Sequence, residues 1–408
     1  MMNQQDLDVL RSLAEQIVET ASSPVMSSRR KAWYRMNALQ SEQPMVLVSP
    51  EGAWKEIREL TPIQCSDPVA CEFEWQLRQR LRQASFEDDM PVEADFVLGY
   101  EIEPDTWGVK IERCHSGMEG GAYKPIPPLT DLSRDLAKLH FRTLRWKKNV
   151  YEQKKEMAEK AFGDLLKIVP APGYCFWTCG MTCNVIDLIG MEELMIGMYD
   201  QPENIHALMQ FLTEDLEQYL DQLERENLLW YNNGSNLVGS GHCGLTDELP
   251  SAEPPVGKVT TAALWGLAES QETVGISPEM FAEFIWPYQK RLLQRFGLAY
   301  YGCCEPVNER LASIREAGNL RAISVFPWAD VEQCARELQK QYVLCHKVNP
   351  SYICLNFNEK EIRRELRSRL DICKGLNNVF VLKDTHTVHH EPERFNRWVE
   401  IVREEFRA

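Results

Sequence analysis

Apolar residues recur at helical spacing near the start of the chain, and a second helical pattern over residues 72–83 carries its charges on one face. A short extended stretch, residues 45–48, lies between the two patterns and runs into a turn signal of Ser, Pro and Gly. No low-complexity linker follows. We therefore predict that residues 1–90 form a helical N-terminal extension packed on the main domain. The apolar positions of the first helix are Leu7, Val9, Leu10, Leu13 and Ile17.

The remaining chain, residues 91–408, alternates short apolar runs with longer amphipathic stretches. Repeated strand–helix units predict an α/β fold with a parallel sheet and right-handed crossovers. The glycine fingerprints of dinucleotide and P-loop folds are missing, so a closed (β/α)8 TIM barrel is favoured over an open doubly wound sheet. The predicted strands are Asp95–Tyr100, Tyr174–Trp177, Leu228–Tyr231, Leu298–Tyr301, Arg321–Val325, Tyr342–Cys345 and Val379–Leu382.

Two long helices are predicted between these strands, over residues 205–223 and 280–296. Ser277 followed by Pro278 is typical of a helix start, since serine caps the first turn and proline fits the first helical position. Asp330 and Asn358 are predicted to cap two further helices.

The charge balance narrows the classes of partner. The chain has 45 Lys and Arg residues against 61 Asp and Glu residues, for a net charge of −16. Nucleic acid and anionic membranes are therefore not expected as partners. No apolar run reaches the roughly 18 residues of a membrane span, and the N-terminus lacks a signal-peptide pattern. A cytoplasmic location is expected, in which the 13 cysteines are reduced thiols.

Reactive side chains follow the predicted strands at the end where barrels carry their chemistry. Cys303, Cys304 and Glu305 follow one strand, and Lys347 and Asn349 follow another. The last strand is followed by Lys383, Asp384, Thr385 and His386, and others are followed by Trp328 and by the segment from Tyr100 to Trp107. If these residues only packed the core, they would not need to follow the strands in this way. A functional site at the barrel mouth requires this placement.

Thiolate, imidazole and carboxylate groups are all zinc ligands, which makes Cys303, Cys304, His386 and Glu269 candidates for a metal site. The alternative is a packed thiol pair and a structural histidine.

Lys347 is read either as an anchor for a carboxylate or phosphate or as a solvated side chain, while Lys383 is expected at the surface. His242 lies in a glycine-rich loop that is predicted to form a lid over the mouth.

Several motifs resemble the uroporphyrinogen decarboxylase superfamily, and most closely its zinc- and corrinoid-dependent methyltransferase branch. The resemblance covers about three quarters of the chain. It is carried by Gly99-Tyr100-Glu101 with Trp107-Gly108, by Ser277-Pro278-Glu279-Met280-Phe281, by Tyr300-Tyr301-Gly302-Cys303-Cys304-Glu305-Pro306, by Lys347-Val348-Asn349-Pro350, and by Lys383-Asp384-Thr385-His386-Thr387-Val388 with Pro392-Glu393-Arg394.

This resemblance implies a methyltransferase that moves a methyl group between a small methylated substrate and a corrinoid protein, with zinc as Lewis acid. The corrinoid would be carried by a separate protein, because no Asp-x-His-x-x-Gly motif is present. Two departures from the family stand out: the N-terminal Met-Arg-Gln-Ala-Gly-Arg motif of the decarboxylases is missing, and Tyr301 replaces a zinc-binding histidine. The resemblance also implies a homodimer.

The expected site residues fall into three groups. The catalytic group is Asp384, His386, Lys347 and Glu305, and the metal ligands are Cys303, Cys304, His386 and Glu269. The substrate site is expected to be lined by Tyr301, Trp328, Trp107, Tyr100, Asn349 and His242.

Two other functions remain open. A metal-independent decarboxylase of the parent type would use Asp95, Asp384 or Lys347 to bind carboxylates or to handle the developing carbanion. A non-enzymatic protein would bind a corrinoid or a metal at the barrel mouth without turnover.

Overall fold

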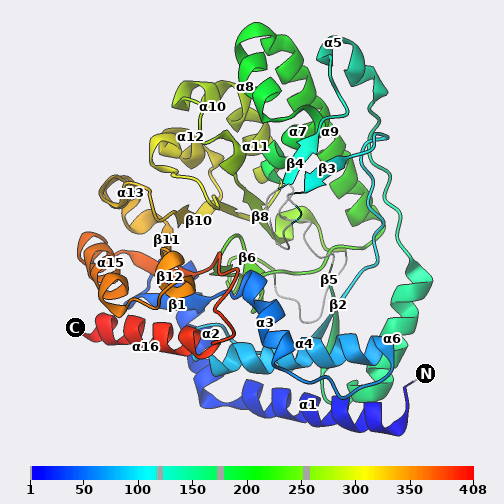
Figure 1. Cartoon of the computed structure of the whole chain (residues 1–408), viewed down its shortest axis with the longest axis vertical. Helices are drawn as coiled ribbons and strands as arrows, with labels where there is room; N and C mark the ends of the chain where they lie inside the picture. Colours follow the sequence, from blue (N-terminus) through cyan, green and yellow to red (C-terminus); the bar gives the residue numbers. More distant parts are fainter. Residues whose placement is uncertain (1, 116, 118–122, 172–178, 251–257) are drawn as a thin grey trace.

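A computed structural model describes residues 2–115, 117, 123–171, 179–250 and 258–408. Its centre is a six-stranded sheet in which all neighbouring strands are parallel (Figure 1). The sheet order is β1 (Met45–Val48), β12 (Asn377–Leu382), β11 (Val343–Lys347), β10 (Leu320–Val325), β9 (Leu298–Tyr301) and β8 (Trp265–Ala268).

A second parallel pair stands apart from the main sheet and joins β2 (Asp95–Gly99) to β5 (Lys167–Ala171). Two short antiparallel ribbons complete the strands: β3 (Glu112–His115) with β4 (Tyr123–Ile126), and β6 (Leu237–Val238) with β7 (His242–Cys243). The α/β class is confirmed. Within the described ranges the parallel strands do not join into a closed ring of eight, so the barrel stays a prediction.

The helices surround the sheets on several sides. They are α1 (Gln4–Ser22), α2 (Pro24–Asn37), α3 (Trp54–Glu59), α4 (Pro68–Ser85), α5 (Leu132–Asp135), α6 (Lys148–Phe162), α7 (Thr182–Ile189), α8 (Met191–Asp200), α9 (Pro202–Arg225), α10 (Pro278–Phe284), α11 (Trp286–Leu293), α12 (Leu311–Ile314), α13 (Val331–Leu338), α14 (Ser351–Cys354), α15 (Glu359–Ile372) and α16 (Glu393–Arg407). In the part of the chain that the structure describes, no helix is both long and apolar enough to cross a membrane.

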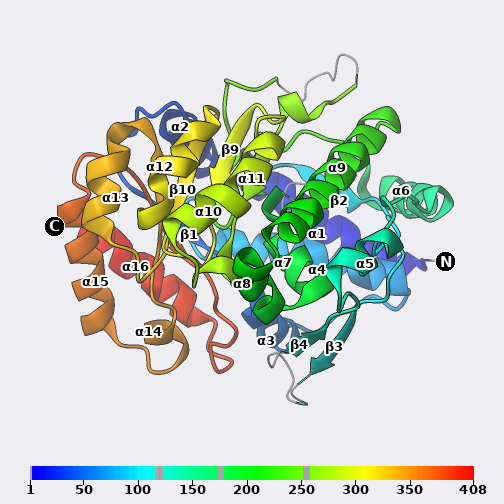
Figure 2. The same ribbon diagram turned by 90° about the horizontal axis from the view of Figure 1, so that it is seen from above.

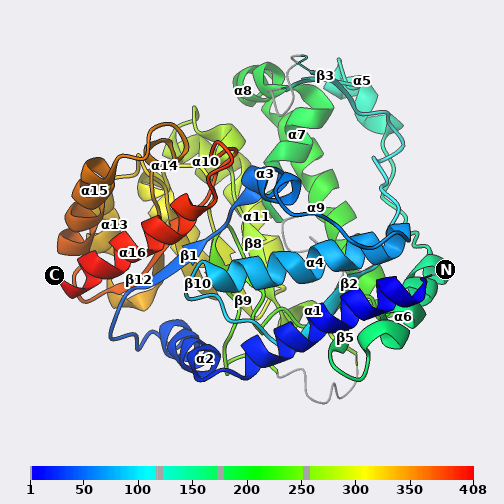
Figure 3. The same ribbon diagram turned by 60° about the horizontal axis from the view of Figure 1, so that its bottom comes forward.

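Helices α1, α4 and α6 cover one side of the β2–β5 pair, and α1 and α4 lie side by side (Figure 3). Aromatic rings fill this interface, with Phe96 of β2 5.0 Å from Phe73 of α4 and 5.0 Å from Phe162 of α6 between ring centroids. Residues 1–90 also supply β1 to the main sheet, in parallel register with β12. The division at residue 90 stays a prediction.

Alternating side chains of the main sheet point to two opposite faces, as the pleat of a strand requires. The outer face packs on helices that include α13 and α15, which lie next to each other in Figure 2. The inner face packs on Trp33 and Met36 of α2. The inner-face residues are Met45, Leu47, Leu267, Tyr300, Ala322, Val343, Cys345, Val379 and Val381.

Most of the predicted elements are present, and two differ for clear physical reasons. The predicted strand Leu228–Tyr231 is not formed; instead the side chain of Asn232 accepts from Trp265 N (2.9 Å) and donates to Trp265 O (3.0 Å). The predicted helix over 280–296 is broken into α10 and α11, because Pro287 lacks the N–H that would continue the first helix. The predicted strand Tyr174–Trp177 lies outside the described residues.

The predicted helix caps are confirmed. The side chains of Ser277, Asp330 and Asn358 accept hydrogen bonds from the backbone N–H of Met280, Gln333 and Glu361, respectively. Each bond satisfies a backbone donor that the first turn of a helix leaves free.

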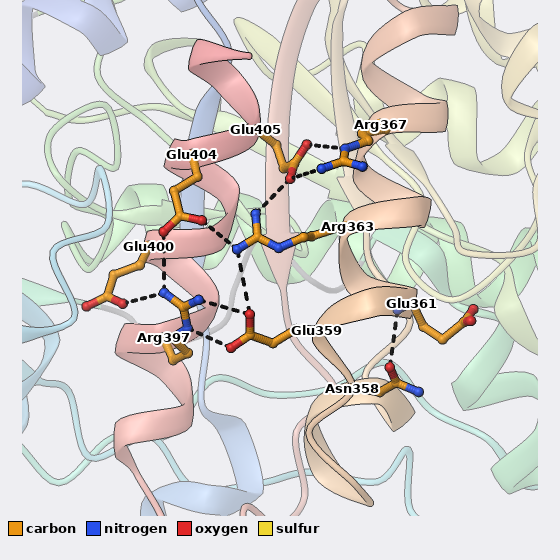
Figure 4. A network of polar contacts seen from close by, with 9 residues as sticks. All are labelled: Asn358, Glu359, Glu361, Arg363, Arg367, Arg397, Glu400, Glu404 and Glu405. Atoms are coloured by element: carbon orange, nitrogen blue, oxygen red, sulfur yellow. Dashed lines mark hydrogen bonds and ion pairs between the residues drawn. The ribbon is translucent and has the colours of Figure 1, made fainter.

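A network of ion pairs joins α15 to α16, and Figure 4 shows its members. The carboxylate of Glu405 is almost fully buried and accepts from Arg363 Nη1 (2.8 Å), Arg367 Nε (2.7 Å) and Arg367 Nη2 (3.0 Å). These bonds, those to Arg367 foremost, lower the pKa of Glu405.

We expect Glu405→Gln to lower the free energy of unfolding by about 1–3 kcal/mol, because the two arginines lose a charged acceptor. Because the folded pKa is lowered, the stabilisation is present above the ordinary glutamate range and is lost as the pH falls below it. Urea unfolding at neutral and at acidic pH measures both effects. Glu400→Gln, at an exposed position of the same network, is the matched control. An equal loss of stability in both variants would contradict the role given to Glu405.

Candidate functional site

Two buried lysines lie where the inner face of the sheet reaches its carboxyl end. Lys383 continues the alternation of Val379 and Val381, and Lys347 continues that of Val343 and Cys345. Lys347 is 1% exposed and Lys383 is 6% exposed. The prediction that Lys383 lies at the surface is therefore wrong, since the pleat turns its side chain inward.

A pair of thiols follows β9 on the same edge. Gly302 has a φ of +98°, a conformation that L side chains rarely adopt, and an added Cβ would lie 3.0 Å from Cβ of Ser324. This turn brings Cys303 N within 2.8 Å of Glu305 Oε2, to which it donates. The sulfur atoms of Cys303 and Cys304 lie 3.5 Å apart. Cys303 is buried and Cys304 is partly exposed.

The ammonium of Lys383 lies among these thiols and two carboxylates. Its Nζ is 3.7 Å from Cys303 Sγ and 4.0 Å from Cys304 Sγ. It donates to Asp384 Oδ1 at 2.9 Å and lies 3.6 Å from Glu51 Oε1. The Asp384 carboxylate oxygens are in turn 3.9 and 3.8 Å from Cys304 Sγ. We call these five residues the thiol–lysine cluster.

The loops after β1 and β12 hold the two carboxylates in place. Asp384 and Glu51 both have positive φ, at 57° and 47°, and the backbone N–H of Asp384 donates to Glu51 Oε2 at 2.9 Å. Gly52 lies against the next turn of the β12 loop, where an added Cβ would be 3.0 Å from Cα of His386. The contact thus holds two residues in a conformation that L side chains rarely adopt.

The electrostatics of the cluster favour one thiolate. The hydrogen bond from Cys304 and the positive charges of Lys383 and Lys347 lower the pKa of Cys303 to about 7, against the opposing effect of burial. The same hydrogen bond and burial raise the pKa of Cys304. Near neutral pH the pair is therefore poised to lose its first proton from Cys303, while Cys304 keeps its proton and donates toward the Cys303 sulfur.

Lys347 lies deeper, beside Tyr300 and the loop that holds His242. Its Nζ donates to Tyr300 Oη at 3.3 Å, and burial lowers its pKa to about 8. His242 was predicted in a lid over the mouth, but the structure buries it under the inner face, where Nε2 is 2.6 Å from Asn37 Oδ1 and Nδ1 is 3.6 Å from Cys345 Sγ. Burial lowers the pKa of His242 to about 3, so its ring is neutral.

Glu305 and Glu269 are buried beside the cluster and serve the backbone. Glu305 accepts from Ser270 N and Cys303 N, both at 2.8 Å, and so ties the loop after β8 to the loop after β9. Glu269 accepts from Gln271 N at 2.9 Å. Burial raises the pKa of both carboxyl groups, and for Glu269 the nearby Glu272 and Glu305 raise it further. The geometry makes Glu305 a positioning residue for Cys303.

The residues predicted to bind substrate lie in different environments. Tyr301 is buried on the outer face and donates to Gln289 Oε1 at 2.8 Å, while Trp107 is buried and donates to Asp215 Oδ2 at 2.8 Å. Tyr100 packs on Tyr151, and the side chain of Asn349 accepts from Ser351 N. Trp328 is 68% exposed beside Phe326.

The predicted zinc ligands do not come together as a set. His386 is exposed and lies against Gly52, and Glu269 is engaged with Gln271. Among the described residues, no group of three or more His, Cys, Asp and Glu side chains is arranged to hold a metal ion. An ammonium about 4 Å from a divalent ion would repel it by about 8 kcal/mol at an effective dielectric constant near 20. With Lys383 between its donors, the thiol–lysine cluster does not fit zinc.

A separate cavity of about 1030 Å³ lies between the β2–β5 pair and the segment around residues 230–236. Its walls combine Trp230 and Tyr231 with the charged side chains of Arg80, Asp95 and Lys167. Asp95 Oδ1 forms an ion pair with Arg80 Nη1 at 2.6 Å. None of the residues of the thiol–lysine cluster lines this cavity.

Lys383 and Glu51 were missed as site residues by sequence reasoning. The alternation through Val379 and Val381 already places Lys383 on the inner face, so its burial could have been predicted from the sequence. No sequence pattern predicts that Glu51 belongs to the cluster, because Glu51 reaches it only through the pairing of β1 with β12.

We expect Lys383→Met to raise the pKa of Cys303, because the substitution removes a positive charge 3.7 Å from the sulfur. An ultraviolet titration of thiolate absorption, with mass spectrometry to locate the titrating cysteine, measures the change. Lys374→Met, at an exposed position after α15, is the control and should leave the titration unchanged. An unshifted Cys303 in Lys383→Met would contradict this electrostatic account.

Comparison with known proteins gives a fold likeness and no family. No protein-family profile matches the chain. No curated protein matches it at a significant level. Among solved structures, a methyltransferase from Methanosarcina mazei is similar, with a TM-score of 0.54 and 13% sequence identity over 94% of this chain and 99% of that chain. At that identity the likeness shows a shared fold, which extends over almost the whole length of both chains.

Proposed function

We propose that this protein is a methyltransferase whose site is the thiol–lysine cluster, with a small methylated substrate and a corrinoid protein as the two methyl partners. The observation that carries the proposal is the buried ammonium of Lys383 beside the Cys303–Cys304 pair at the carboxyl edge of the sheet. The motif resemblance and the fold shared with a methyltransferase support it. The corrinoid partner rests on the motif resemblance.

The cluster supplies what methyl transfer from a heteroatom needs. When the bond between the methyl carbon and its heteroatom breaks, both electrons stay on the heteroatom, and the acceptor provides the pair for the new bond. The leaving heteroatom therefore gains negative charge. An ammonium and a thiol in a low-dielectric setting stabilise that charge, and one of them can give it a proton. In this proposal Lys383 stabilises the charge and Cys304 gives the proton; the Nζ and Sγ atoms of the two residues lie 4.0 Å apart.

Access to the cluster comes from the side of Cys304 and Asp384. Both are partly exposed, whereas Cys303 and Lys383 are buried behind them. Asp384 holds the ammonium in place through its 2.9 Å bond, and so orients the positive charge toward the open side. Because zinc does not fit among these groups, we assign no step of the reaction to a metal.

The direct test measures methyl transfer with free cobalamin as the probe. Purified protein is incubated with cob(I)alamin and a panel of methyl ethers, methyl thioethers and methylamines, and methylcobalamin formation is followed by its absorption spectrum. We expect turnover with one class of donor. In Lys383→Ala the rate should fall on the order of 10²–10³-fold, the usual cost of losing one group that stabilises developing charge.

Lys374→Ala is the matched control, because Lys374 is exposed and precedes β12, whereas Lys383 follows the other end of that strand; this variant should retain the wild-type rate. Equal rates in Lys383→Ala and wild type would contradict the role of the cluster. Absence of methyl transfer from every donor class, in either direction, would contradict the proposed function.

A decarboxylase is the second candidate, and the cavity beside β2 is the observation that favours it. Asp95 lies in its wall with Arg80 and Lys167, so cationic groups that bind a carboxylate adjoin an acid–base group. Such an enzyme would release carbon dioxide and ignore cobalamin. We expect Asp95→Asn to leave methyl transfer unchanged. Loss of a carbon dioxide-releasing activity in that variant, with no cobalamin reaction in wild type, would favour this candidate instead.

A further inference from the structure

Two donors of the thiol–lysine cluster, the sulfurs of Cys303 and Cys304, have about the spacing of two ligands to one metal ion. The two sulfurs are 3.5 Å apart, and two sulfurs bound to one zinc ion at 2.3 Å in tetrahedral geometry are about 3.8 Å apart. The carboxylate of Asp384 adds an oxygen 3.8 Å from Cys304 Sγ. Two thiols and a carboxylate from two separate loops are thus brought to one point.

The side chain of Lys383 lies beside the position that such a metal ion would need, close enough to repel the ion and to crowd it. Its Nζ lies within 4.0 Å of both sulfurs and donates to the same carboxylate at 2.9 Å. The Glu51 carboxylate, 3.6 Å away on the opposite loop, adds a further negative charge. Since the lysine side chain is 8% exposed, packing holds the ammonium among these groups.

We propose that the ammonium of Lys383 is the built-in cation of this site and that it closes a latent metal site made of Cys303, Cys304 and Asp384. A divalent ion is excluded by charge and by volume, while the thiols and the carboxylate keep a positive partner at all times. The inference concerns the binding properties of the cluster and does not depend on which group the enzyme transfers.

The test measures metal binding to the tag-free full-length chain. Zn²⁺ is titrated into wild type and Lys383→Ala, with Co²⁺ as a second probe because a thiolate ligand produces a charge-transfer band. We expect Lys383→Ala to bind about one equivalent of Zn²⁺ and to show the cobalt–thiolate band, with an affinity at least about tenfold tighter than wild type.

Three variants show whether the new binding comes from this cluster. Lys383→Arg keeps the positive charge and should stay closed to metal. Lys383→Ala combined with Cys304→Ser should lose the acquired zinc. Lys347→Ala removes the other buried lysine of this edge and should gain none, because Lys347 donates to Tyr300 and not to the thiols.

The wild-type chain gives an independent readout that needs no variant to fold. Excess Zn²⁺ should leave the alkylation of the Cys303–Cys304 pair by iodoacetamide unchanged, with each modified cysteine identified by mass spectrometry. Protection of the pair by zinc in wild type would overturn the proposal. So would equal zinc affinity in wild type and folded Lys383→Ala, or equal gain in the arginine and alanine variants.

Discussion

The site depends on one constraint, the burial of the Lys383 ammonium at the end of the inner face. A buried cation is costly unless opposite charges and hydrogen-bond acceptors surround it. Here they come from the loop after β1 (Glu51), the loop after β9 (the thiol pair) and the loop after β12 (Asp384). One charge therefore ties together three loops that are far apart in the sequence.

The backbone around the cluster is arranged to meet that constraint. Gly302, Glu51 and Asp384 all have positive φ, and for the two non-glycine residues this conformation costs on the order of 1–3 kcal/mol each. The bond from Asp384 N to Glu51 Oε2, together with the packing of Gly52 against the β12 loop, holds these conformations. The ion pairs of Lys383 with Asp384 and Glu51 oppose this cost and hold the ammonium beside the thiols.

The two proposals give the same side chain a common physical role. In the methyltransferase branch that the motifs resemble, zinc supplies the positive charge at the reacting centre. Under the proposed function, the buried lysine among the thiols supplies that charge in this chain. Tyr301, at the position where the resemblance implies a zinc-binding histidine, packs in the core of the outer face. Without a metal ion to bind, the thiols of Cys303 and Cys304 form a hydrogen-bonded pair that shares a proton.

Local pattern in the sequence determined the strand β9, most of β10, β11 and β12, the long helix α9 and three helix caps, because each depends on residues within a few positions of one another. It also placed the reactive residues at the carboxyl ends of strands. Tertiary structure decided the rest. Leu228–Tyr231 is not a strand because a single side chain, Asn232, provides the pairing with β8. His386 is outside the cluster and Glu51 inside it because the pairing of β1 with β12 sets which loops meet, and that contact joins positions more than 300 residues apart.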